Sequence, residues 1–120
     1  MFVVMLVLDQ QELLPRVLDA WQEAGVRGAT VLESTGMHRI RQCRLRLHAR
    51  FDLAHIADEC MESHYTLFAV VEDMALVEAC LAATEGVTGD LSQPNTGVFV
   101  AWPVAFAKGV STGLVDGRES

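Results

Sequence analysis

Three largely apolar runs, at residues 2–8, 65–71 and 98–107, constrain the fold of this chain most strongly. Each run is as long as a strand and much shorter than the roughly 18 residues that a membrane helix needs. Apolar runs of this length are typical of strands buried in a sheet. Residues 29–35 form a fourth, weaker strand candidate. Pro103 lies inside the last run and favours a sheet edge or a bulge there.

Two main helices are predicted between these strands. Residues 12–24 place five apolar side chains at helical spacing, namely Leu14, Val17, Leu18, Trp21 and Ala24. Gly25 is expected to end this helix, and Pro15 fits its first turn, where a missing N–H costs little. Asp73 is the expected N-cap of an alanine-rich second helix that ends near Gly86. A polar, turn-forming loop then leads to the last strand.

The segment between the second and third of these strands adds further elements. Residues 43–51 alternate between apolar and polar side chains, which predicts a half-buried strand with a basic outer face. Asp52 can cap a short helix that follows. We therefore predict an α+β fold, a ferredoxin-like βαββαβ sandwich with an antiparallel sheet, both main helices on one face, and an inserted strand and short helix between the halves. A neighbouring subunit would cover the other face of so apolar a sheet.

Length and charge narrow the class of protein. A chain of 120 residues with 51% hydrophobic residues fits one folded domain, expected at residues 1–108, with a flexible tail at 109–120. The net charge is −7, yet five of the nine basic residues are arginines within residues 39–50. Nucleic-acid binding is not expected, because it needs a broad basic surface. The arginines predict instead a site for a small anion or a protein partner.

Other residue patterns point away from secretion, metal binding and nucleophilic catalysis. The first residues lack a basic leader and a cleavage site, and three cysteines without metal-type spacing suit a reducing cytoplasm. Cys60 and His64 are four residues apart, but together with His48 and His55 they make no secure ligand set, so no metal site is expected. We expect Cys43 and Cys80 to be core residues, and Trp102 and Phe106 to serve packing or an interface.

The residues from Gly25 to Arg39 resemble a known family. They fit the pattern Gly-x-x-Gly-x-Thr-Val-x-Glu-x-x-Gly-x-x-Arg of the PII-like superfamily of small trimeric signalling proteins, at Gly25, Gly28, Thr30, Val31, Glu33, Gly36 and Arg39. A looser match covers Thr88-Gly89-Asp90 and the residues from Asn95 to Val100, which resemble the family's Gly-Asp-rich loop and final strand. With the order of elements, the resemblance covers about residues 2–107.

This resemblance implies a cytoplasmic, non-enzymatic homotrimer that senses a small anionic metabolite or nucleotide in clefts between its subunits. One wall of each cleft would consist of Thr30, Gly36, Met37, His38 and Arg39. The other would consist of Asp90, Asn95, Thr96 and Gly97, with Lys108 as the nearest cation after the last strand. The outward arginines would form a surface for a regulated protein partner, at Arg41, Arg44, Arg46 and Arg50.

The chain departs from the family where the family holds ATP. The family's phosphate-binding lysine falls on Gly97, and its second turn glycine is His38. An adenine nucleotide with fewer phosphates, such as a monophosphate, or another small anion such as bicarbonate therefore fits better than ATP. Two alternatives stay open: a small enzyme on the same scaffold, with His38 or His64 as general base beside Arg39, and a CutA-type trimer, which shares the topology.

Overall fold

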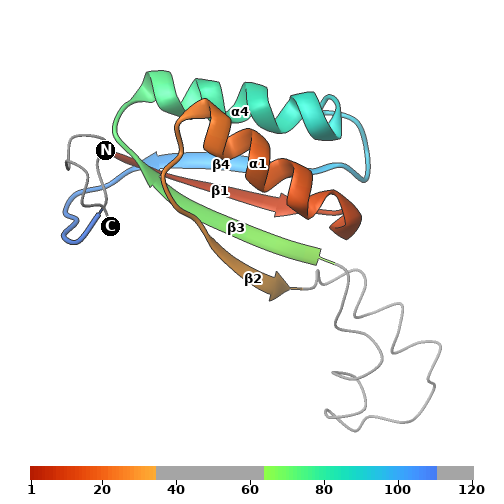
Figure 1. Cartoon of the computed structure of the whole chain (residues 1–120), viewed down its shortest axis with the longest axis horizontal. Helices are drawn as coiled ribbons and strands as arrows, with labels where there is room; N and C mark the ends of the chain where they lie inside the picture. Colours follow the sequence, from red (N-terminus) through yellow and green to blue (C-terminus); the bar gives the residue numbers. More distant parts are fainter. Residues whose placement is uncertain (35–63, 111–120) are drawn as a thin grey trace, which may run out of the picture.

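The computed structural model describes residues 1–34 and 64–110. In chain order these residues form β1 (Phe2–Leu8), the short 3-10 turn η1 (Gln11–Leu13), α1 (Leu14–Ala24), β2 (Thr30–Ser34), β3 (His64–Val71), α4 (Met74–Thr88) and β4 (Gly97–Pro103) (Figure 1). The inserted strand at 43–51, the short helix after Asp52 and most of the expected tail lie outside the described residues. No helix in the two described ranges is long and apolar enough to cross a membrane.

The four described strands form one antiparallel sheet with the order β2-β3-β1-β4. Both helices lie on the same face of this sheet, and the opposite face carries neither of them (Figure 1). The fold is therefore α+β, and it is compatible with the ferredoxin-like sandwich. β4 is an edge strand, as Pro103 predicted, and Pro103 is its last residue.

The core lies between the sheet and the helices. Its fully buried side chains include Leu6, Leu67 and Trp21, and the helices contribute Val17, Val77 and Cys80 to the same cluster. Two consecutive buried hydrogen bonds join α1 to α4. Trp21 Nε1 donates to Thr84 Oγ1 at 2.8 Å, and Thr84 Oγ1 donates to the carbonyl of Cys80 at 2.8 Å. The indole N–H of Trp21 and the hydroxyl of Thr84 both have hydrogen-bond partners as a result.

The helix ends confirm some of the predicted signals and correct others. Gly25 ends α1 with a left-handed φ of 111°, and Asp73 caps α4 by accepting the Leu76 N–H at 2.9 Å. The first helix was expected from residue 12, but residues 11–13 form the tighter η1 turn instead. The second helix was expected to end near Gly86 but continues to Thr88. Gly86 needs no unusual backbone conformation, whereas Gly89, with a φ of 87°, does.

The last strand is shorter than its apolar run predicted. It was expected over residues 98–107, but β4 ends at Pro103, which pairs with Phe2, the first residue of β1. Beyond that point β1 offers no partner apart from the Met1 carbonyl, which accepts the Val104 N–H at 3.0 Å. Phe106 is consequently 81% exposed instead of lying in the sheet.

Candidate functional site

The sheet face that points away from the helices is apolar. Because side chains alternate along a strand, and Val4, Leu6 and Leu8 are buried against the helices, the residues between them face the other way. Paired residues share a face, so the register extends this assignment to all four strands. We call this the open face. Thr30 and Thr66 also lie on it. Its apolar side chains are those of Val3, Met5, Val7, Leu32, Phe68, Val70, Val98, Val100 and Trp102.

Several side chains of the open face are strongly exposed in the single chain. Leu32 is 51%, Val98 54% and Trp102 43% exposed. A contiguous apolar patch of this kind on a folded protein marks an interaction site. The open face is therefore the part of the described surface best suited to bind another protein surface.

One polar row closes the open face at the end where β1 finishes. We call it the end row: Ser34, His64, Asp9 and Thr96, one residue from each strand or from its immediate end. Ser34 pairs with His64, and continuing the register by one residue places His64 beside Asp9 and Asp9 beside Thr96. The contacts agree: His64 Nε2 lies 2.9 Å from Asp9 Oδ1, and the Asp9 N–H donates to the Thr96 carbonyl at 3.4 Å.

The end row is partly shielded from solvent. The side chain of His64 is 12% exposed and that of Asp9 is 27% exposed. Ser34 Oγ is 2.9 Å from Thr66 Oγ1, so a hydroxyl pair lies next to the contact between His64 and Asp9. Sequence reasoning named His64 only as an alternative base and missed Asp9 and Ser34. Their position at the ends of consecutive strands was the signal that could have found them.

The described residues of the two predicted walls lie on opposite edges of the sheet. Thr30 begins the edge strand β2, whereas Gly97 begins the edge strand β4, and β3 and β1 separate them. Three strand spacings correspond to about 14 Å. One subunit therefore does not bring Thr30 together with Asn95, Thr96 and Gly97. The remaining residues of the first wall, Gly36, Met37, His38 and Arg39, and the expected partner surface, Arg41, Arg44, Arg46 and Arg50, lie outside the described residues.

The loop before β4 is held by its own polar side chains. Asp90 Oδ1 accepts the backbone N–H of Ser92 at 2.9 Å and its hydroxyl at 2.8 Å, and these bonds hold the pKa of the Asp90 carboxyl below its usual value. The hydroxyl of Thr96 donates to the carbonyls of Gln93 at 2.8 Å and of Leu91 at 3.3 Å. The loop is thus braced from within before any ligand is present.

Two backbone positions fix where this loop joins the sheet. Asn95 has a left-handed φ of 64° and Gly97 a φ of 147°. A Cβ at Gly97 would overlap the carbonyl oxygen of Val7, so only glycine lets β4 begin this close to β1. Gly97 therefore holds Thr96 against the end of β1.

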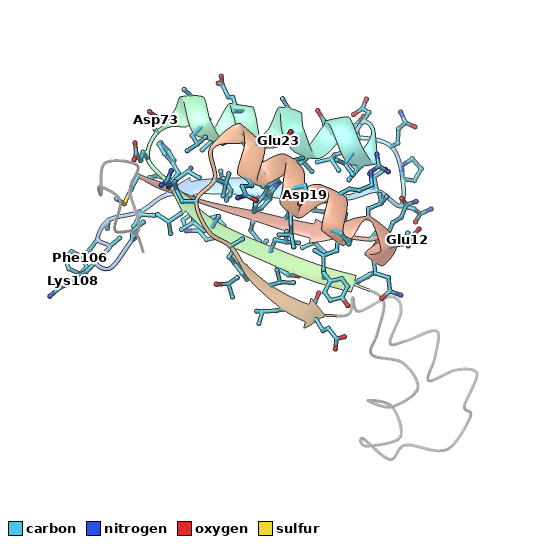
Figure 2. All side chains as sticks on the ribbon, viewed as in Figure 1. Glu12, Asp19, Glu23, Asp73, Phe106 and Lys108 are labelled. Carbon is cyan, nitrogen blue, oxygen red and sulfur yellow. The ribbon has the colours of Figure 1, made fainter. Side chains whose placement is uncertain are left out.

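Lys108 lies away from this loop. It follows β4 at the end where β1 begins, next to the exposed Phe106 (Figure 2). β4 spans seven residues, so Lys108 and Thr96 are separated by at least the length of that strand, about 23 Å. Within one subunit these two predicted site residues do not meet.

A cavity of about 410 Å³ lies beside the start of β2. Val3, Phe68 and Val70 of the open face contribute apolar walls, and Arg27, Gly28 and Thr30 line it from the connection between α1 and β2. In the described residues, Arg16, Arg27 and Lys108 are the only lysines or arginines, and of these Arg27 alone lines the cavity. An apolar wall with one guanidinium suits a small ligand that has both a hydrophobic part and a negative charge.

The described residues contain few other reactive groups. Cys80 is buried as expected, and desolvation raises the pKa of its thiol to about 12, so the thiol stays protonated at neutral pH. Within residues 1–34 and 64–110, no three His, Cys, Asp or Glu side chains are close enough to hold a metal ion. The end row and the cavity are thus the two places where the described chain gathers functional groups.

Comparison of the chain with protein-family models gives no match, and comparison with curated proteins gives none either. The resemblance carried by residues 25–39 therefore stays a prediction. Function has to be inferred from the open face, the cavity and the loops at the sheet ends.

Proposed function

We propose that this protein is a PII-like signalling protein that binds a small anion between copies of itself and passes the bound state to a protein partner. The observation that supports the proposal is that Thr30 and Thr96, described residues of the two expected walls, lie on opposite edges of the sheet. A ligand that touches both walls needs a second copy of the chain, because β1 and β3 lie between them within one copy. In a cyclic trimer, the β2 edge of one subunit would meet the β4 edge of the next.

The open face supplies a reason for the copies to associate. It carries apolar side chains from all four strands, and burial of such a surface is the main driving force for protein association. The cavity beside Thr30 opens at this face, so association would place it at a subunit boundary. A site at such a boundary is a common position for a regulatory ligand, because binding then alters the contact between subunits.

The ligand is a small anion with an apolar or aromatic part, of which an adenine nucleotide monophosphate is one example. Its flat part would lie on Val3, Phe68 and Val70, and Arg27 would bind its negative charge. The chain between residues 39 and 62, which carries most of the arginines, would bind the regulated partner. Ligand binding would act by shifting the population of conformations at the cleft.

Thermal unfolding with added AMP, ATP, inorganic phosphate and bicarbonate, at constant ionic strength, tests this proposal. A ligand at about 100 times its Kd stabilises the native state by about 2.7 kcal/mol, which raises Tm by several degrees. We expect Arg27→Gln and Thr30→Val each to raise the apparent Kd of the ligand at least tenfold and so to reduce the rise in Tm. The matched control Thr88→Val, whose hydroxyl bonds to the Gly89 carbonyl away from the cavity, should bind normally. If none of the four anions stabilises the protein, the sensor proposal is wrong.

A second candidate function is favoured by the contact between His64 and Asp9. A carboxylate bound to one imidazole nitrogen orients the ring and leaves the other nitrogen as a general base, and Ser34 lies directly opposite His64. The protein would then be a small hydrolytic enzyme. Turnover of p-nitrophenyl esters that is lost in His64→Gln and kept in Thr88→Val would favour this candidate over the sensor.

A further inference from the structure

Asp9 contacts the ends of both long connections of the sheet through its side chain and its backbone. Its carboxylate binds His64, where the chain re-enters the sheet after residues 35–63. Its backbone N–H donates to Thr96, where the loop of residues 89–96 meets β4. Asp9, which follows the fully buried Leu8, therefore links the ends of the two connections.

The contacts around Asp9 are suited to transmit a displacement. The hydroxyl of Thr96 is bonded to the carbonyls of Leu91 and Gln93 in the loop of residues 89–96. A displacement of this loop would therefore displace Thr96 as well. Gly97 packs against the Val7 carbonyl without space for a Cβ, so Thr96 cannot move far without moving the end of β1. On the other side, the His64 ring is 12% exposed and held by a charged acceptor, which leaves it little freedom.

We propose that Asp9 couples the loop of residues 89–96 to His64 and thereby sets the position of the His64 ring. Asp9 and His64 are positioning residues and contact no ligand in this scheme. Their physiological role rests on the proposed function, in which one connection contributes to the ligand site and the other binds the partner. The coupling itself is a property of the fold and is measurable without any ligand.

The test starts with ring resonances of His64 in long-range ¹H–¹⁵N NMR spectra, assigned among the four histidines by their loss in His64→Gln. Thr96→Val keeps the shape of the side chain and removes the hydroxyl bonds to Leu91 and Gln93. We expect it to displace the His64 resonances. Glu78→Gln, an exposed substitution within α4 and outside both connections, should leave them in place.

The role of Asp9 is tested by repeating the comparison in Asp9→Ala and Asp9→Asn. In Asp9→Ala the His64 resonances should no longer respond to Thr96→Val. Asp9→Asn should restore part of the response, because its amide oxygen can still accept a hydrogen bond. If Asp9→Ala does not fold, a weakened response in Asp9→Asn decides the question. An unchanged response in either Asp9 variant, or no response in the wild type, would overturn the proposal.

Unfolding equilibria give a second readout. In the wild-type background, Thr96→Val and His64→Gln should be non-additive by about twofold or more in the unfolding constant, as expected for residues in one network. In Asp9→Ala the two effects should add. Both experiments use ligand-free protein, so a failure to bind AMP or phosphate would refute the sensor proposal and leave this result unaffected.

Discussion

At the residue scale, Thr84 holds the two helices together. It lies in the core with no exposed surface, accepts a hydrogen bond from Trp21 and donates one to the carbonyl of Cys80. Because its hydroxyl donates back to the preceding turn of its own helix, the oxygen's remaining lone pair points toward the indole. The fit of Trp21 in the core therefore depends on one hydroxyl.

We predict that Thr84→Val destabilises the protein by about 1–3 kcal/mol, the cost of leaving a buried donor unpaired. The shape of the side chain is almost unchanged, so loss of the hydrogen bond to Trp21 Nε1 is the main effect. Urea unfolding followed by Trp fluorescence measures it. Thr84→Ser keeps the hydroxyl and should lose less. Equal losses in the two variants would show that the methyl group matters more than the hydrogen bond.

At the scale of the elements, α4 shows that a glycine inside a helix is a cost to stability and does not always end it. Gly86 lies within α4, and a Cβ built on it would meet no atom within 4 Å. We predict that Gly86→Ala stabilises the protein by about 0.5–1 kcal/mol, because alanine loses less backbone entropy on folding. Chemical unfolding gives the sign directly.

Gly97→Ala is the matched comparison at the start of β4 and should have the opposite effect. There the added methyl group would overlap the Val7 carbonyl, and the φ of 147° is strained for any side chain. A stabilised Gly97→Ala variant would mean that the junction of β4 with β1 is less tightly packed than described.

Elements whose signals are local were predicted well from the sequence. β1 coincides with the run at 2–8, and Gly25 and Asp73 act as the expected helix stop and cap, because each depends on residues close in the chain. The end of β4 was predicted too late, because it depends on where β1 begins. The contact of Asp9 with His64 was missed for the same reason, since only the register of the sheet brings them together. Thr30, Asn95 and Thr96 were chosen by resemblance, and their separation on two sheet edges could not be read from the chain.

At the scale of the whole molecule, the open face is the largest apolar surface on the described strands. We predict that the protein is oligomeric in solution and that Val100→Asp, in the middle of β4 on the open face, lowers its mass toward that of a monomer. A carboxylate there would have to be buried without a partner on association. Size-exclusion chromatography with light scattering measures the mass.

Met74→Asp is the control for this prediction. Met74 is 50% exposed on α4, on the other side of the sheet, so its loss should leave the mass unchanged. A monomeric wild-type protein would refute the self-association on which the proposed site depends. A mass that falls equally in both variants would point to a general loss of folding.

The pairing of Ser34 with His64 has a consequence for how such a protein can change over evolution. The chain leaves the sheet at one of these residues and returns at the other, and the two lie side by side. Lengthening a connection whose ends already meet costs little, about 0.6 kcal/mol for each doubling of its length. A change in the length of the chain between Ser34 and His64 therefore costs little closure entropy as long as these two residues stay paired.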